Sequence, residues 1–421
     1  MSQSTASILQ DPLGWLNSAV PQSESPLRLK GVPLTARIIL SICSRIEIGA
    51  MGIVLPDGRS LVFRGKEPGP QGVILLHDYR ALSRLASGGS LGLAESYLDG
   101  EWDSPDLTAV LEAGVLNGRR FSDFFKVSPL KRAFDRIIHA LRPNTRAGAR
   151  RNIHAHYDLG NTFYERWLDP TMTYSSALFE SRDQSLASAQ TSKYRALADM
   201  MDLKPGEHVL EIGCGWGGFA EYAARERGAR ITGLTISREQ LDYASARIQR
   251  QGLGDRVDLR FQDYRDVAGT FDKVASIEMF EAVGEKYWPA YFGKIRDVLK
   301  PGGAAALQII TIEDEQFETY RRTVDFIQKY VFPGGMLPSM QALKSETTKA
   351  GLTWDSHFAF AKDYARTLAE WRRHFLAAWP DIESTEFDAR FKRLWTFYLA
   401  YCEAGFKGGA IDVVQLKLTR S

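Results

Sequence analysis

The sequence predicts an α/β protein with two parts: a doubly wound, Rossmann-like sheet with helical additions, and a smaller mixed α/β domain at the N-terminus. From about residue 203, short apolar runs alternate with amphipathic stretches, as in a parallel sheet covered by helices on both faces. A glycine-rich turn at residues 211–218 follows the first run and opens a helical stretch. The 421 residues exceed one ordinary domain, so a second folded unit is expected.

The composition excludes several classes of protein. With 44% hydrophobic and 25% charged residues, the chain can bury a core and differs from disordered or fibrous sequences. A net charge of +2 gives no argument for a nucleic-acid partner. Cys43, Cys214 and Cys402 lie far apart without metal-ligand spacing, which predicts a reduced cytoplasmic protein without a bound metal. The chain shows no signal-peptide pattern and no run of about 18 apolar residues, so neither export nor a membrane span is expected.

Residues 1–118 form the predicted N-terminal domain. Ile46–Gly65 alternates apolar and polar side chains around a Pro-Asp-Gly turn, which predicts a β-hairpin. Val73–Asp78 is a further expected strand. The spacing from Tyr79 to about Val115 is helical, with breaks at the Gly88-Gly89 pair, at Gly100 and at Pro105. We expect this domain to face lipid.

Residues 119–151 are strongly basic. They hold ten Lys and Arg residues against two Asp, interleaved with large apolar side chains. Such a segment can form an amphipathic helix that lies on anionic lipid headgroups. It can equally be a linker helix with its basic face in water, and the sequence leaves both interpretations open.

Residues 152–421 form the predicted catalytic domain. Beyond Thr311 the chain is expected to be mostly helical to about Lys407, and Val413–Thr419 is expected to be a last strand. The helical stretches between the earlier strands include residues 238–251 and 287–299. The apolar runs that predict the earlier strands are His208–Gly213, Arg230–Leu234, Val257–Phe261, Lys273–Ile277 and Ala305–Ile310.

The glycine turn indicates a nucleotide-type ligand. Its spacing also satisfies the dinucleotide fingerprint, but NAD needs an acid at the end of the second strand, and no carboxylate occurs there before Glu239. Acids stand instead at Glu211, before the glycines, and at Asp263, after the third strand. Asp263 can accept a hydrogen bond from an adenine amine while Tyr264 covers the ring. This arrangement resembles S-adenosylmethionine methyltransferases, and the alternative is a purely structural turn.

Further motifs resemble one family, the cyclopropane fatty acid and mycolic acid synthases. The resemblance runs from about Ile153 to the C-terminus and implies a class I S-adenosylmethionine methyltransferase core. The motifs that carry it are His156–Asn161, Phe163-Tyr164, Trp167–Asp169, Met172–Ser175, Glu211–Gly218, Gly233–Thr235, Gln262–Arg265, Met279–Gly284, Tyr330–Gly335 and Phe375–Pro380. The residues that it implies for cofactor binding are Tyr174, Ser175, Gly213, Gly215, Thr235, Gln240, Asp263 and Tyr264.

The resemblance also implies a reaction. The methyl group of S-adenosylmethionine would be transferred to a cis double bond in an acyl chain of a membrane phospholipid, leaving a carbocation. Removal of a proton from the transferred methyl would then close a cyclopropane ring. The partners implied are unsaturated phospholipid and an anionic membrane surface, with the protein cytoplasmic and peripheral on the inner face of the membrane. A homodimer is compatible with the sequence, which does not determine the oligomeric state.

The resemblance to the family implies that the base is a bound bicarbonate ion. Glu281 and Tyr364 match the family's Glu and Tyr, and Ile310 matches its backbone contact. Ser176 replaces a Cys and Gln308 replaces a His; both can still donate a hydrogen bond to an anion, but the titratable His is lost. Methyl transfer is therefore better supported than ring closure. The alternatives are a methyl-branched product without ring closure, a small-molecule methyltransferase and a non-catalytic lipid-binding homologue.

Two features receive simpler interpretations. Glu278, on the same strand end as Glu281, is expected to be an exposed loop acid, with an additional site carboxylate as the alternative. Trp371, Phe375 and Trp379 stand at helical spacing and are expected to form a core stripe. Only the family context makes part of that stripe a lining for an acyl chain.

Overall fold

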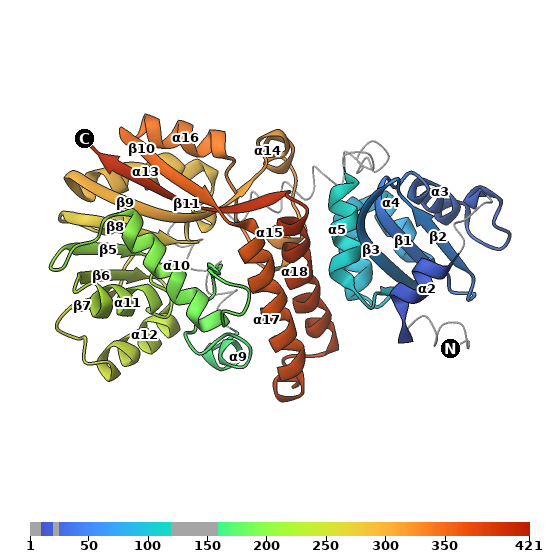
Figure 1. The fold of residues 1–421 in the computed structure, drawn as a ribbon, viewed down its shortest axis with the longest axis horizontal. Coiled ribbons are helices and arrows are strands. Elements are labelled where there is room, and N and C mark those ends of the chain that lie inside the picture. Colours follow the sequence, from blue (N-terminus) through green and yellow to red (C-terminus); the bar gives the residue numbers. More distant parts are fainter. Residues whose placement is uncertain (1–9, 20–24, 119–158) are drawn as a thin grey trace. The chain divides into compact units, whose positions relative to one another are not determined.

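The computed structural model describes residues 10–19, 25–118 and 159–421 (Figure 1). These residues form two compact units. The first contains the described residues up to 118 together with Glu383–Ala410, and the second contains residues 159–382 and Ile411–Ser421. The basic stretch at 119–151, for which a lipid-bound helix and a linker were both considered, lies outside the described residues.

The first unit is built on a four-stranded mixed sheet with the strand order β2-β1-β3-β4. The expected hairpin is confirmed: β1 (Ile48–Val54) pairs antiparallel with β2 (Ser60–Arg64). β3 (Glu67–Leu76) runs parallel to β1, and the short β4 (Trp102–Asp103) pairs antiparallel with β3. The helices of this unit that precede residue 119 are α2 (Pro12–Ser18), η1 (Pro26–Arg28), α3 (Leu34–Cys43), α4 (Arg80–Leu98, broken at Gly89) and α5 (Leu107–Leu116).

A helix from near the C-terminus completes the first unit. The sequence-based division assigned residues 152–421 to one domain, whereas α18 (Ala389–Lys407) packs against α5 and α4. Its Glu403 carboxylate is buried, accepts a hydrogen bond from the Thr108 hydroxyl at 3.0 Å and pairs with Lys407. Local sequence patterns cannot reveal this packing, because the partners are almost 300 residues apart in the chain.

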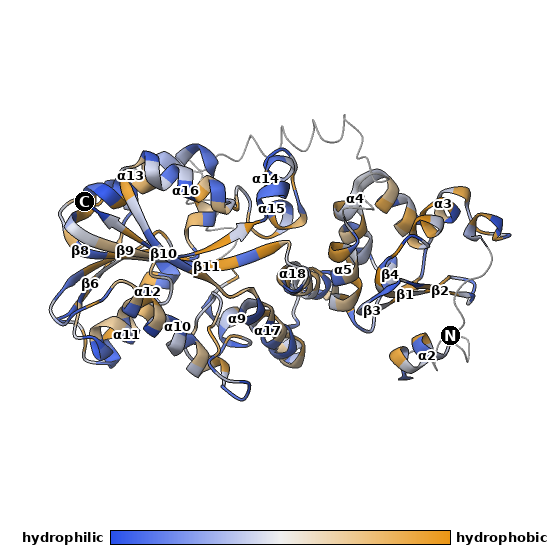
Figure 2. Cartoon of the chain, turned by 45° about the horizontal axis from the view of Figure 1, so that its top comes forward, coloured by the Kyte–Doolittle hydropathy of each residue, from blue (hydrophilic) through white to orange (hydrophobic). Residues whose placement is uncertain are grey.

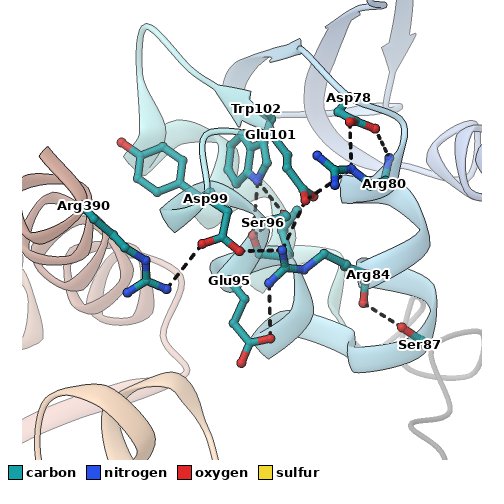
Figure 3. Close-up of polar contacts among 12 residues, drawn as sticks. Asp78, Arg80, Arg84, Ser87, Glu95, Ser96, Asp99, Glu101, Trp102 and Arg390 are labelled. Atoms are coloured by element: carbon teal, nitrogen blue, oxygen red, sulfur yellow. Dashed lines mark hydrogen bonds and ion pairs between the residues drawn. The ribbon is translucent and has the colours of Figure 1, made fainter.

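Arg84 organises the polar contacts between α4 and the turn that follows it (Figure 3). Its guanidinium donates to Asp99 at 2.7 Å and to Glu101 at 3.2 Å. Asp99 also accepts from Arg390 of α18 at 3.3 Å. One ionic network therefore holds the end of α4, the start of β4 and a helix from the far end of the sequence.

Arg393 should anchor α18 more strongly than Arg390. It donates to the backbone oxygens of Tyr97 and Trp102, forms an ion pair with Asp103 at 2.7 Å and lies over the Tyr97 ring. We expect Arg393→Ala to cost about 2 kcal/mol, because two carbonyls each lose a donor and Asp103 loses an ion pair, and the exposed Arg390→Ala to cost less than about 0.5 kcal/mol. Hydrogen exchange of residues 389–407 measures this. Equal protection in the two variants would contradict the role of Arg393.

The second unit contains a seven-stranded sheet with the strand order β10-β11-β9-β8-β5-β6-β7. The five strands predicted from residues 208–310 are confirmed, and they run parallel in the centre and at one end of the sheet. β11 pairs antiparallel with β9, and β10 pairs antiparallel with β11. The strands are β5 (His208–Ile212), β6 (Arg230–Thr235), β7 (Val257–Phe261), β8 (Phe271–Ile277), β9 (Leu299–Ile312), β10 (Leu352–Ala359) and β11 (Ile411–Arg420).

Helices cover both faces of this sheet (Figure 2). α10 (Leu186–Met200), α11 (Gly218–Glu226) and α12 (Arg238–Arg250) lie on one face, and α13 (Trp288–Val298) and α16 (Met340–Lys349) lie on the other. A separate apolar cluster fills the space on each side. The remaining elements are α9 (Asn161–Glu165), η2 (Tyr264–Asp266), η3 (Phe280–Ala282), η4 (Glu285–Tyr287), α14 (Asp314–Tyr320), α15 (Phe326–Tyr330) and α17 (Ala361–Ile382).

The edge strand β10 was not expected, because the chain after Thr311 was predicted to be mostly helical. Its sequence, Leu352–Ala359, is largely exposed, and its alternation of Leu352, Trp354 and Phe358 with polar residues is interrupted at Ser356, next to a register shift. Its partner β11 comes more than fifty residues later. Among the described helices, none combines the length and apolar character that a bilayer crossing requires.

Candidate active site

The site lies at the carboxyl ends of β5 and β8, neighbouring parallel strands from which the chain departs in different directions. Ligands bind at such a switch point in open α/β sheets. The glycine loop follows β5, and the N–H groups of Gly213 and Cys214 both donate to the carbonyl of Leu234 in β6. Glu278 and Glu281 follow β8. The sheet therefore brings the glycine loop and two carboxylates to one edge.

Glycine is required at positions of the loop that include Gly213 and Gly215. Gly213 has φ +83° and Gly215 has φ +51°, a backbone region that other residues rarely adopt. A Cβ added to Gly213 would lie 2.7 Å from Met279, whereas one added to Gly215 would meet no atom within 4 Å. Gly215 therefore leaves open space beside the N-terminus of α11, as the approach of a ligand requires.

Glu211 lies at the end of β5, directly beneath the loop. Its side chain is buried, and its Oε2 atom has no hydrogen-bond partner among the described residues. Burial raises the pKa of Glu211 to about 8, against the opposing charges of Lys193 and Arg247. A buried carboxylate oxygen without a partner in the described part of the chain fits a ligand carrying positive charge, because the cation would supply the missing interaction.

The other predicted cofactor residues gather around the same edge. The Thr235 hydroxyl donates to Gln240 at 3.1 Å, so these two side chains hold each other after β6. Arg265 binds both oxygens of the buried Asp263 carboxylate, which fixes the direction of that side chain. Burial raises the pKa of Tyr264 to about 12, so its hydroxyl stays neutral near pH 7.

Tyr174 and Ser175 belong to a segment that contacts the glycine loop from outside the sheet. The Tyr174 ring lies 5.4 Å from Tyr164 and 5.2 Å from Trp371 of α17. Tyr164 lies 5.1 Å from Trp216 of the loop, and the Trp216 indole donates to Asn161 at 2.8 Å. The expected core stripe of α17 is confirmed, because Trp371, Phe375 and Trp379 are all buried. An aromatic wall therefore stands next to the glycine loop.

Glu278 occupies the centre of the predicted base site. Its Oε1 accepts from the Ser176 backbone N–H at 2.8 Å and from the Gln308 amide at 2.7 Å. Its Oε2 accepts from the Tyr364 hydroxyl at 2.6 Å. The expectation of an exposed loop acid was wrong, because a φ of +49° turns the chain after β8 and the carboxylate is bound from three directions. Burial raises the pKa of Glu278, opposed by Tyr364 and Lys193.

Glu281 lies beside Glu278. Its Oε1 accepts from the Ile310 backbone N–H at 2.6 Å, and its buried Oε2 has no partner in the described part of the chain. Burial, followed by the negative charge of Glu278, raises the pKa of Glu281 to about 8. Two neighbouring carboxylates thus share one edge of the site, and one of them has an oxygen available to a ligand.

The donors assigned to bicarbonate do not fit that ion in this structure. Gln308 and Tyr364 donate to Glu278, and the Ile310 N–H donates to Glu281. The Ser176 hydroxyl donates to the carbonyl of Ala177 at 2.9 Å. Each expected donor therefore already has a protein acceptor, and an added anion would lie against two carboxylates.

Two residues of the site were missed from the sequence. Lys193 in α10 is fully buried and donates to the Ser175 hydroxyl at 2.5 Å; burial lowers its pKa to about 7, opposed by acids that include Glu278 and Glu211. Gln415 in β11 donates to the Gln308 oxygen at 3.0 Å, which orients the Gln308 NH₂ towards Glu278. The sequence around Lys193 does not mark it as a site residue, because a lysine is ordinary in a polar helix. A glutamine inside the apolar run of β11 is unusual and gives a weak indication of a role for Gln415.

The family model for mycolic acid cyclopropane synthetase matches residues 144–416, more than half of the chain. The chain belongs to this family. It is 41% identical over 367 residues to tuberculostearic acid methyltransferase UfaA1 of Mycobacterium tuberculosis, covering 82% of this chain and 83% of that protein. It is 37% identical over 343 residues to cyclopropane-fatty-acyl-phospholipid synthase of Escherichia coli K12, covering 80% and 85%.

A solved structure supports the same relationship. Mycolic acid cyclopropane synthase CmaA1, complexed with SAH and CTAB, is 29% identical with a TM-score of 0.60, covering 64% of this chain and 98% of that one. The protein is therefore a class I methyltransferase that uses S-adenosylmethionine and methylates or cyclopropanates lipid acyl chains. The space at Gly215 and the unpartnered acid at Glu211 fit this cationic cofactor.

A single methyl group at Gly215 should interfere with cofactor binding. We expect Gly215→Ala to weaken S-adenosylmethionine binding at least about tenfold in titration calorimetry, because Cβ enters ligand space at a positive φ. Gly252→Ala is the matched control, since Gly252 has φ +65° and equally open surroundings but ends α12 away from the site. Similar affinities for both variants would remove Gly215 from the cofactor site.

Proposed function

We propose that the protein transfers the methyl group of S-adenosylmethionine to a cis double bond of an unsaturated phospholipid acyl chain, with a cyclopropane as the product. The observation that carries this proposal is the pair of neighbouring carboxylates, Glu278 and Glu281, at the strand edge that also holds the glycine loop. An alkene becomes a cation when it takes up a methyl group. A site with negative charge and proton acceptors suits that intermediate.

The bound cofactor supplies an electrophilic methyl carbon, and the protein supplies the surroundings. Tyr174 and Trp371 present aromatic faces, which attract a cation electrostatically. Tyr164 and Trp167 extend the same wall and are buried, so they limit the access of water. Exclusion of water matters because water would otherwise capture the cation as an alcohol.

The position of proton loss decides the product. If the proton leaves the transferred methyl, the freed electron pair closes a cyclopropane ring. If it leaves the acyl chain, the product is a methyl-branched alkene, which is the second candidate. The replacements Ser176 and Gln308 favour this second candidate, because they remove the Cys and the titratable His that the family resemblance associates with ring closure.

Incubation with unsaturated phospholipid vesicles and S-adenosylmethionine tests the proposed function. We expect mass spectrometry of the fatty acid methyl esters to show the gain of one CH₂ group, and NMR to show cyclopropane ring protons. Vesicles of fully saturated lipid are the control, since they offer no double bond. Alkene and methyl-branch signals would select the second candidate, and an unchanged acyl mass would reject both.

An exposed surface on the first unit supports lipid as the partner. Leu27, Leu34 and Ile38 of η1 and α3 are 48%, 62% and 44% exposed, and Arg37 ties the two elements together through the Leu27 carbonyl. Residues 25–46 contain no acidic residue and four basic ones, which are Arg28, Lys30, Arg37 and Arg45. Apolar side chains among positive charges match an anionic bilayer surface.

Removing the apolar part of this surface should weaken docking. We expect the double variant Leu34→Ser, Ile38→Ser to bind anionic vesicles about tenfold less in co-sedimentation, because two side chains lose their insertion into lipid. Leu376→Ser is the control: Leu376 is also exposed, at 37%, but lies on α17 of the other unit. Undiminished binding by the double variant would exclude this surface as the docking face.

A further inference from the structure

We propose that the Glu278 carboxylate takes the place of an external anion in this site and accepts the proton that the methylated acyl chain loses. The inference rests on the proposed function and assigns its base to the chain itself. Nothing in the sequence pattern requires it. It follows from where the side chain lies in the folded protein.

The first argument is the set of donors. Three groups from different parts of the second unit converge on one carboxylate: the Ser176 N–H, the Gln308 amide of β9 and the Tyr364 hydroxyl of α17. Ser176, Gln308 and Tyr364 are also the positions that the family resemblance assigns to a bound anion. The donors that would hold an external anion are therefore occupied by a carboxylate of the protein itself.

The second argument is the backbone. Glu278 has φ +49°, which is unfavourable for a residue with a side chain, and its N–H donates to the Gln308 carbonyl at 2.8 Å. The surrounding strands thus hold Glu278 in a strained conformation. Strain of this kind persists where the fold fixes a side chain at a functional position.

The third argument is charge. A second anion would lie beside both Glu278 and Glu281, where burial, followed by the negative charge of Glu278, already raises the pKa of Glu281. Lys193, buried in α10, is the cation that acts on Glu278. Its charge also acts on Asp169 and Glu211, so little of it is left for a further anion.

The proposed step balances without an added reagent. A C–H bond of the cationic acyl chain breaks, its electron pair closes the ring or forms an alkene, and the proton passes to a Glu278 oxygen. The carboxylic acid then returns the proton to solvent. No oxidant or reductant takes part, and the positive charge of the intermediate leaves with the proton.

Bicarbonate dependence tests the proposal. In bicarbonate-free buffer we expect wild-type turnover to be unchanged, whereas Glu278→Gly loses about 100-fold. Added bicarbonate should restore much of the Glu278→Gly rate, because the missing side chain leaves room and free donors. Glycine also accepts the positive φ, so this variant should fold. Glu278→Gln should lose turnover without restoration, since its amide fills the space.

A binding measurement complements the rates. In NMR spectra recorded without cofactor, we expect Glu278→Gly to broaden the ¹³C-bicarbonate line and the wild-type protein to leave it unchanged. Wild-type turnover that needs bicarbonate, full activity of Glu278→Gly without it, or a loss that bicarbonate fails to restore would each overturn the proposal. Wild type that alters no acyl chain would instead reject the proposed function, so the two failures are distinguishable.

The pH profile separates a base from a merely structural carboxylate. The groups that face Glu278 are Tyr364, Lys193 and Glu281, with the neutral Gln308 and the Ser176 N–H. The Tyr364 hydrogen bond lowers the pKa of Glu278, so Tyr364→Phe should raise it and move the acid limb of kcat/KM to higher pH. An unshifted limb would contradict Glu278 as the proton acceptor.

Discussion

The site depends on one hydrogen-bonded arrangement, the partly buried Glu278 carboxylate held by the Ser176 N–H, the Gln308 amide and the Tyr364 hydroxyl. These contacts join β8, β9, α17 and the segment that precedes α10. A carboxylate removed from water is costly unless its oxygens are hydrogen-bonded, so the three donors make its position possible. Gln415 extends the arrangement by fixing the direction of the Gln308 amide. Four separate parts of the sheet and its helices therefore meet at one anionic group.

The electrostatics of the site follow from this arrangement. Burial raises the pKa values of Glu211 and Glu281 to about 8 and lowers that of Lys193 to about 7. All three groups therefore titrate near neutrality, where small changes in their surroundings shift the protonation state. A cationic cofactor near Glu211 and a cationic intermediate near Glu281 would both favour the ionised carboxylates. The aromatic wall of Tyr164, Tyr174 and Trp371 provides the low-polarity side of the same site.

The first unit shows a different constraint. Its sheet has only four strands, and α18 from the far end of the chain supplies a further helix to its core. Arg393 binds backbone carbonyls near β4, and Glu403 pairs with Thr108 and Lys407. The first unit, which carries the exposed surface of Leu34 and Ile38, is therefore completed by a helix that follows every strand of the seven-stranded sheet except β11 in the sequence. Folding of the two units is linked through chain connectivity.

The sequence alone determined the parallel core, the glycine loop and the family motifs, because strand periodicity and close spacing are local properties. It also led to Glu281, Tyr364, Ser176, Gln308 and Ile310 as neighbours, through resemblance. Only the tertiary structure decided that Glu278 occupies the centre of this group, that Lys193 is buried beside it and that α18 belongs to the first unit. Edge strand β10, which is exposed and weakly patterned, became visible only through its pairing with β11. Each of these depends on contacts between residues far apart in the chain, and local patterns carry no information about such contacts.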